Sequence, residues 1–155
     1  MESTNEKKQL EVAEIQLAYR STVKASMRPK VTGAKDAEQI LRQTWDEDKI
    51  ELVEQFKVLL INRANKVLGV LEVSQGGISG TVADPKIIFS TALKAAACGI
   101  ILSHNHPSGN LTPSQADIDL TKKLKEGGKF LEISILDHII LTSESYFSFA
   151  DEGLL

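Results

Sequence analysis

Two histidines, a serine and an aspartate lie close together in residues 104–117, HNHPSGNLTPSQAD. His104 and His106 are one residue apart at the end of an apolar run, so in an extended strand both side chains leave the same face. Two imidazoles and the carboxylate of Asp117 leave the fourth tetrahedral position of Zn²⁺ open for water, which is typical of catalytic zinc sites. The segment therefore predicts a hydrolase with zinc as its cofactor.

The residues around these ligands predict a strand, a turn and a helix. The sequence PSGN at 107–110 is rich in turn formers. Thr112 is expected to cap the following helix, with Gln115 closing a capping box. Ser114 and Asp117 are three residues apart and would share one helix face near the N-terminus, where the macrodipole favours a carboxylate.

The spacing H-x-H, seven residues, S, two residues, D resembles the motif of the JAMM (JAB or MPN+) metalloproteases, matched by His104, His106, Ser114 and Asp117. The string HNHPSGN and the later strings LDHIIL and YFSF are similar to the bacterial RadC proteins, over roughly the last two thirds of the chain. This resemblance implies that the two histidines and Asp117 ligate zinc and that Ser114 hydrogen-bonds the oxyanion of a tetrahedral intermediate. It also implies a peptide, isopeptide or other amide substrate.

The family implies a general base as well, a glutamate upstream of the histidines. Glu54 is the best candidate, because the string EQFKVL at 54–59 resembles the RadC segment that carries this glutamate. Its parity agrees: Glu54, Phe56 and Val58 alternate in a predicted strand, so the carboxylate would face the apolar side, where it needs a partner. Three other glutamates are rivals for this role: Glu47, Glu51 and Glu72.

Each assignment has a purely structural alternative. The H-x-H pair alone is weak evidence, and it is the register of serine and aspartate that favours a metal site. Ser114 also fits an ordinary first-turn serine. Ser108 fits a turn serine, and a contribution of Ser108 to the site is the alternative interpretation. His138, beside Asp137 in an apolar run, fits a core histidine. Alternatively, His138 and Asp137 support the metal ligands from behind.

The composition indicates a single soluble domain. The chain has 155 residues, of which 42% are hydrophobic and 25% charged, enough to bury a continuous core. No run approaches the ~18 apolar residues of a membrane span, and the polar start MESTNEKK lacks a signal-peptide apolar segment, so we expect a cytoplasmic protein. The single cysteine, Cys98, is expected to be a buried thiol and not a fourth ligand.

The charge argues against nucleic acid as a partner. The net charge is −3 and no basic run exceeds two residues, whereas a phosphate-binding surface needs clustered Lys and Arg. RadC-like proteins are linked by name to DNA repair, so an accessory role in repair, recombination or mobile elements is a second hypothesis. Longer RadC-like chains carry an N-terminal helix-hairpin-helix region, for which this chain shows no pattern. A non-catalytic interaction module is a third hypothesis, which the intact ligand set disfavours.

These patterns predict one α+β (α/β-like) domain over 1–155, a mixed sheet flanked by helices. The family resemblance implies a JAMM/MPN-like fold with cytidine-deaminase-like layering. The motif core would span about 50–150 and residues 1–9 would be frayed. The predicted elements are a strand at 15–19, a helix at 34–45, strands at 54–62 and 66–73, a short strand between the glycines of 76–80, a helix from 85 to about 97 capped by Asp84, the metal strand from 98, a motif helix stopped at Gly127 and Gly128, and two strands within 131–142.

Overall fold

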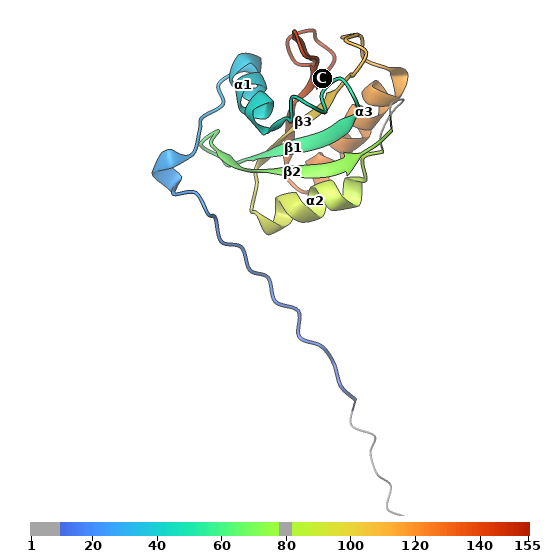
Figure 1. The fold of residues 1–155 in the computed structure, drawn as a ribbon. Helices are drawn as coiled ribbons and strands as arrows, with labels where there is room; N and C mark the ends of the chain where they lie inside the picture. The colour runs from blue at the N-terminus through green and yellow to red at the C-terminus, as the bar shows by residue number, and fades with distance from the viewer. Residues whose placement is uncertain (1–9, 78–81) are drawn as a thin grey trace, which may run out of the picture.

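The fold is built on one five-stranded sheet (Figure 1). The computed structural model describes residues 10–77 and 82–155 of the chain. The elements are η1 (Ala25–Met27), α1 (Ala34–Thr44), β1 (Gln55–Ile61), β2 (Val67–Gln75), α2 (Pro85–Lys94), β3 (Gly99–Asn105), α3 (Gln115–Phe130), β4 (Ser134–Leu141) and β5 (Tyr146–Ser148). The strand order is β2-β1-β3-β4-β5. Only β3 and β4 run parallel, so the sheet is mixed and the predicted α+β class is confirmed.

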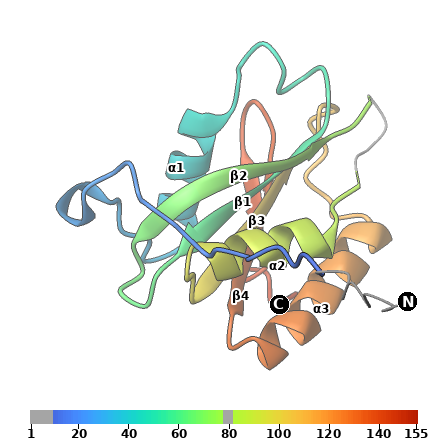
Figure 2. The ribbon, with the colours of Figure 1, turned by 90° about the horizontal axis from the view of Figure 1, so that it is seen from below.

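The helices cover both faces of the sheet, with α1 on one face and α2 and α3 on the other (Figures 1 and 2). Alternation along β1 divides its apolar residues between two cores. Phe56 and Val58 point into the core under α2 and α3, while Leu59 and Ile61 pack towards α1. The three-layer arrangement explains why every residue of β1 and β3 is buried, including the polar residues at the site end of β3.

Helix α2 begins where the sequence predicts, because the Asp84 side chain accepts a hydrogen bond from the Lys86 N–H and Pro85 occupies the first position. Helix α3 begins two residues later than predicted. Its N-cap is Ser114, not Thr112. A complete capping box forms between Ser114 and Asp117 and satisfies two backbone N–H groups, whereas the Thr112 N–H that the expected box would have used donates to Asn110 Oδ1.

The predicted stop at Gly127 and Gly128 is wrong, since α3 continues through both glycines to Phe130. These positions are small because neighbours approach closely: a Cβ on Gly127 would meet the Phe89 ring, and one on Gly128 would overlap the Ile133 carbonyl oxygen. The two strands predicted within 131–142 are a single strand, β4, because Leu136 and Asp137 lie inside the ladder with β3.

The strand predicted at 15–19 does not form. Residues 10–20 are extended but pair with no strand, and the alternating side chains are exposed, Ile15 to 94% and Leu17 to 82%. A strand needs a neighbour for its backbone groups, and this segment has none within the described chain. The frayed start at 1–9 and most of the short strand predicted near Gly80 fall outside the described residues. No helix in the described ranges is long and apolar enough to cross a membrane.

Replacing Gly128 with alanine tests the close approach of α3 to the chain before β4. Alanine normally stabilises a helix by up to about 1 kcal/mol relative to glycine, but here the new Cβ would overlap a backbone oxygen that cannot move cheaply. We expect Gly128→Ala to lower the free energy of unfolding by about 1–2 kcal/mol, measured by urea denaturation. Gly33→Ala, where a Cβ meets nothing within 4 Å, is the matched control; a stabilised Gly128→Ala would contradict the packing.

Candidate metal centre

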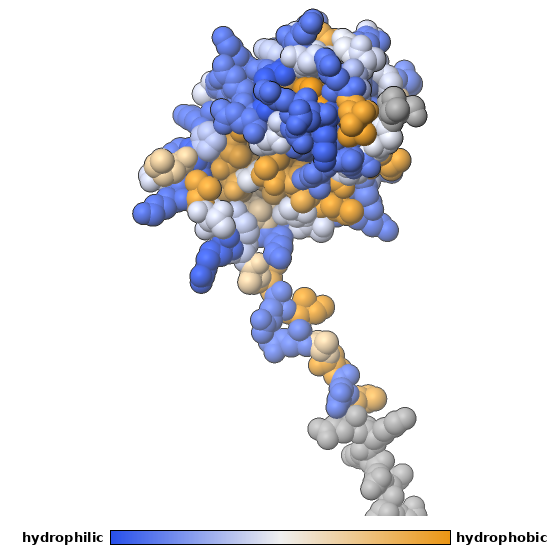
Figure 3. All heavy atoms as spheres, in the orientation of Figure 1, coloured by the Kyte–Doolittle hydropathy of each residue, from blue (hydrophilic) through white to orange (hydrophobic). Residues whose placement is uncertain are grey.

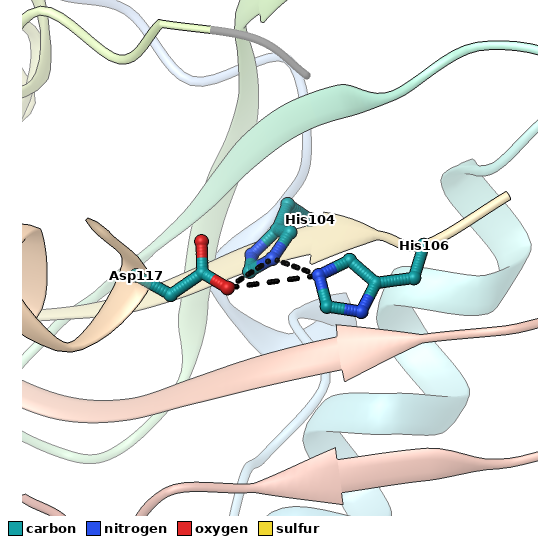
Figure 4. A group of neighbouring side chains, drawn as sticks. All are labelled: His104, His106 and Asp117. Carbon is teal, nitrogen blue, oxygen red and sulfur yellow. Dashed lines mark hydrogen bonds and ion pairs between the residues drawn. The ribbon is translucent and has the colours of Figure 1, made fainter. Parts of the chain in front are cut away.

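Three ligand atoms from two elements converge at the carboxyl end of β3 (Figure 4). His104 lies near the end of β3, His106 directly follows this strand, and Asp117 comes from the first turn of α3. The two Nε2 atoms are 2.9 Å apart, and Asp117 Oδ2 lies 3.4 Å from His104 Nε2 and 3.6 Å from His106 Nε2. The His104 side chain is buried, whereas those of His106 and Asp117 remain 16% exposed, so solvent reaches one side of the group.

The capping box of α3 orients the carboxylate. The Ser114 N–H donates to Asp117 Oδ2 at 2.8 Å, and the Asp117 N–H donates to Ser114 Oγ at 3.1 Å. Burial raises the pKa of the Asp117 carboxyl, but its contacts with the imidazoles of His104 and His106 outweigh this effect and hold that pKa well below its usual value. Asp117 is therefore an anion with one oxygen aimed at both imidazoles.

A chain of hydrogen bonds behind His104 fixes its tautomer. The Thr121 hydroxyl donates to the carbonyl oxygen of Asp117 at 2.7 Å, so its oxygen must accept from His138 Nδ1, also at 2.7 Å. His138 then carries its proton on Nδ1, and its Nε2 accepts from His104 Nδ1 at 2.8 Å. Burial lowers the pKa of His138 far below its usual value, which keeps this imidazole neutral. His104 is left with an unprotonated Nε2 facing the other ligands.

His106 reaches the same state by a shorter route. Its Nδ1 donates to the backbone carbonyl of Asn110 at 2.5 Å, in the turn between strand and helix, so Nε2 is the nitrogen with the free electron pair. Two imidazole lone pairs and a carboxylate oxygen thus face one another. Such a group is repulsive unless a cation lies between its members, and a divalent metal that prefers nitrogen and oxygen ligands fits it.

The metal-free protein can hold a proton in place of that cation. A hydrogen bond to Asp117 raises the pKa of His106 above its usual value, against the opposing effect of burial. The proton and the metal compete for the same Nε2 atom.

Glu54 lies immediately before β1, on the face of the sheet that carries His104. The register pairs Phe56 with His104, so two residues further along, Glu54 comes opposite the ligand end of β3. Its side chain is half-buried, and burial raises the pKa of the carboxyl above its usual value, against the opposing charges of His104 and His106. The structure therefore places the predicted base close enough to the ligand group for His104, His106 and Asp117 to affect its pKa.

Asn105, between the two histidines, faces the opposite side of the sheet and holds the chain segment on either side of Glu54 in place. Its Oδ1 accepts from the Gln55 N–H at 2.8 Å, and its Nδ2 donates to the carbonyls of Ile50 at 2.8 Å and Val53 at 2.9 Å. One side chain thus ties the strand of the ligands to the loop before β1. Asn105 thus faces away from the ligand group and holds the loop before β1.

The remaining predicted residues do not approach the ligand atoms. Ser108 is exposed and only accepts from the Asn110 N–H. Asp137 points to the α1 face, where Ser148 Oγ and the Ala150 N–H donate to its carboxylate, so a position behind the metal is wrong for this residue. Cys98 is half-buried at the far end of β3 and belongs to no ligand group in the described chain.

Sequence reasoning missed Thr121 and the aromatic walls of the site. Thr121 lies four residues after Asp117 and hence on the same helix face, which is the only signal that could have drawn attention to it. The Phe56 ring stacks on His104 with ring centroids 5.9 Å apart, and Phe149 stacks on His138 at 4.6 Å. Both look like ordinary core residues in a sequence.

The fold and the ligand group together define a JAB/MPN-type domain. Residues 31–154 match the family model described as the RadC-like JAB domain, and the chain belongs to this family. A UPF0758 protein of Flavobacterium johnsoniae is 43% identical over 144 residues, which cover 92% of this chain and 62% of that protein. A UPF0758 protein of Pelobacter propionicus is 41% identical over 118 residues, covering 74% and 52%. The chain thus spans about three fifths or less of these relatives' length.

Thr121→Val tests the hydrogen-bond chain behind the ligands. Valine keeps the shape but cannot accept from His138, so the tautomers of His138 and His104 are no longer fixed. We expect metal affinity to fall about 10-fold or more, measured by competition with a chromophoric chelator. Thr91→Val is the matched control, because Thr91 makes the same helical bond to the carbonyl four residues earlier but lies in α2, away from the ligands. Equal affinities of the two variants would refute the role of Thr121.

Metal binding should weaken on acidification. The metal must displace the proton that Asp117 favours on His106, so affinity falls as the pH drops through the raised pKa of His106. The metal-free fold behaves oppositely: the protonated pair stabilises it below the unfolded pKa of histidine, and this contribution disappears as the pH rises through the folded pKa. Zinc affinity and the thermal midpoint of the metal-free protein, each measured from about pH 5 to about pH 8, check both signs. Zinc affinity that is flat over this range would contradict the competition.

Proposed function

We propose that this chain is a zinc-dependent hydrolase of peptide, isopeptide or other amide bonds. The observation that carries the proposal is the pair of histidine Nε2 atoms, both left unprotonated by their hydrogen bonds and both facing Asp117 Oδ2. His104, His106 and Asp117 would hold the ion. Zinc in such a site polarises a substrate carbonyl and lowers the pKa of a water molecule.

Glu54 is proposed as the general base. A carboxylate with a raised pKa takes up a proton more readily near neutral pH than an ordinary surface glutamate, and it can then deliver that proton to the leaving amine. The half-buried setting supports this role, since burial is what raises the pKa. Glu47 and Glu51 are exposed on the loop before β1, which makes them weaker candidates.

Ser114 is proposed to stabilise the oxyanion. In the capping box its hydroxyl oxygen accepts from the Asp117 N–H, which leaves the hydroxyl proton available to donate. The residue is exposed beside a ligand, so a substrate carbonyl can approach it. A donor fixed by a helix N-terminus needs little rearrangement when negative charge develops on the substrate oxygen.

Two substitutions separate metal binding from proton transfer. Glu54→Gln should keep stoichiometric zinc and lose hydrolysis by about 10²-fold or more, because the amide cannot take up the proton. Asp117→Ala should lose the metal itself. Zinc content and turnover would be measured on the same samples, with substrates found by screening the wild type against peptide, isopeptide and other amide libraries. Full activity of Glu54→Gln would exclude Glu54 as the base.

A further inference from the structure

An extended apolar arm precedes the domain, and within the described residues only its last residue, Tyr19, contacts the rest of its own chain. We define the arm as residues 10–19, LEVAEIQLAY. Its large apolar side chains are far more exposed than a single chain requires: Leu10 86%, Val12 89%, Ile15 94% and Leu17 82%. Figure 1 shows the arm running away from the sheet. Contiguous exposed apolar side chains in an extended segment are typical of a surface that is buried in a complex.

The edge of the sheet nearest to the arm offers a matching surface. β2 is the first strand in the sheet order, with β1 as its one strand neighbour among the described residues. The chain before α1 already bonds the start of this edge, where the Val67 N–H donates to the Pro29 carbonyl, so the edge left for another strand begins after Val67. Val70 on this strand is 45% exposed, and apolar surface gathers over β2 and α2 on the face from which the arm departs (Figure 3). An edge strand of this kind readily accepts an additional extended strand.

The base of the arm already touches this edge. Tyr19 and the residues after it line a hollow of about 250 Å³ together with Leu68 and Val70 of β2 and Lys94 of α2. The Tyr19 hydroxyl donates to the Leu68 carbonyl at 3.5 Å. The C-terminal end of the arm therefore lies against this edge, whereas the remainder of the arm leaves it.

Length and charge also match. The ten residues of the arm span about 33 Å when extended, enough to run along the part of the nine-residue β2 that follows Val67. The arm carries two acidic residues, Glu11 and Glu14, and no basic one. Helix α2, beside the edge, carries two lysines, Lys86 and Lys94, and no acidic residue. Opposite charges of this kind favour one orientation of docking and speed association.

We propose that the arm of one chain adds a strand to the β2 edge of a second copy, and that two copies exchange arms reciprocally. A two-fold axis lets both arms and both edges be covered at once, which is the usual solution for a self-complementary surface. The partner is a second copy because each chain carries both surfaces and its own arm projects away from its own edge.

The oligomeric state of the full chain tests the exchange. Sedimentation equilibrium of the wild type should give the mass of two chains. The arm variant Ile15→Asp/Leu17→Asp and the edge variant Val70→Asp should each associate at least 10-fold more weakly, because they place charge within the buried surface. Gln16→Asp, on the other face of the arm, and Phe130→Asp, an exposed apolar position on α3, are charge-matched controls that should remain dimeric.

Mixing the two disrupted variants distinguishes exchange from folding back. The arm variant keeps an intact edge and the edge variant an intact arm, so an equimolar mixture should form more dimer than either variant alone. Zinc content, which does not depend on the arm, verifies that both variants fold. A monomeric wild type whose arm amides are protected from hydrogen exchange would show that the arm docks on its own chain and would overturn the proposal. A monomer with unprotected arm amides, or a dimer unaffected by Ile15→Asp/Leu17→Asp, would do so equally.

Discussion

The position of one proton governs this site. A histidine can offer a metal either nitrogen, and only the hydrogen bond on the opposite side of the ring decides which one carries the lone pair. Here two successive hydrogen bonds make that decision. Thr121 fixes the tautomer of His138, and His138 in turn fixes the tautomer of His104. Because the threonine also bonds the carbonyl of Asp117, the helix that supplies the carboxylate and the strand that supplies the imidazole are oriented by the same hydroxyl.

The rest of the fold supplies the conditions under which such a chain persists. A neutral histidine in the core is stable only if both ring nitrogens are paired, and the parallel pairing of β3 with β4, with Leu102 opposite His138, places it one strand away from His104. Phe56 and Phe149 exclude water from the two rings, which strengthens each hydrogen bond relative to its value in solvent. The capping box then serves two purposes, since it begins α3 and holds the ligand carboxylate.

The grouping of the candidate ligands and the fold class could be predicted because their signals are local. H-x-H on a strand and S-x-x-D at a helix start depend on fixed short spacings, and the alternation in β1 shows which face Glu54 shares. What could not be predicted depends on contacts between distant segments. Thr121 acquires its role only when β4 brings His138 beside it. Gly128 predicts a helix stop in the sequence, and only the structure shows that it is small because Ile133 packs against it. The apolar alternation at 15–19 predicts a strand, but no described strand lies next to it.

Asp137 carries a consequence for the limits of the folding unit. Its carboxylate is buried on the α1 face, and two of its hydrogen-bond donors, Ser148 Oγ and the Ala150 N–H, lie after the last long strand. Burial raises its pKa even with these donors in place, and their removal would leave Oδ2 without its donor and only the His138 N–H bonded to Oδ1. The segment following β4 is thus part of the folding unit: a chain that ended before Ser148 would lose both donors and be destabilised, although the candidate metal ligands and the proposed base all lie upstream.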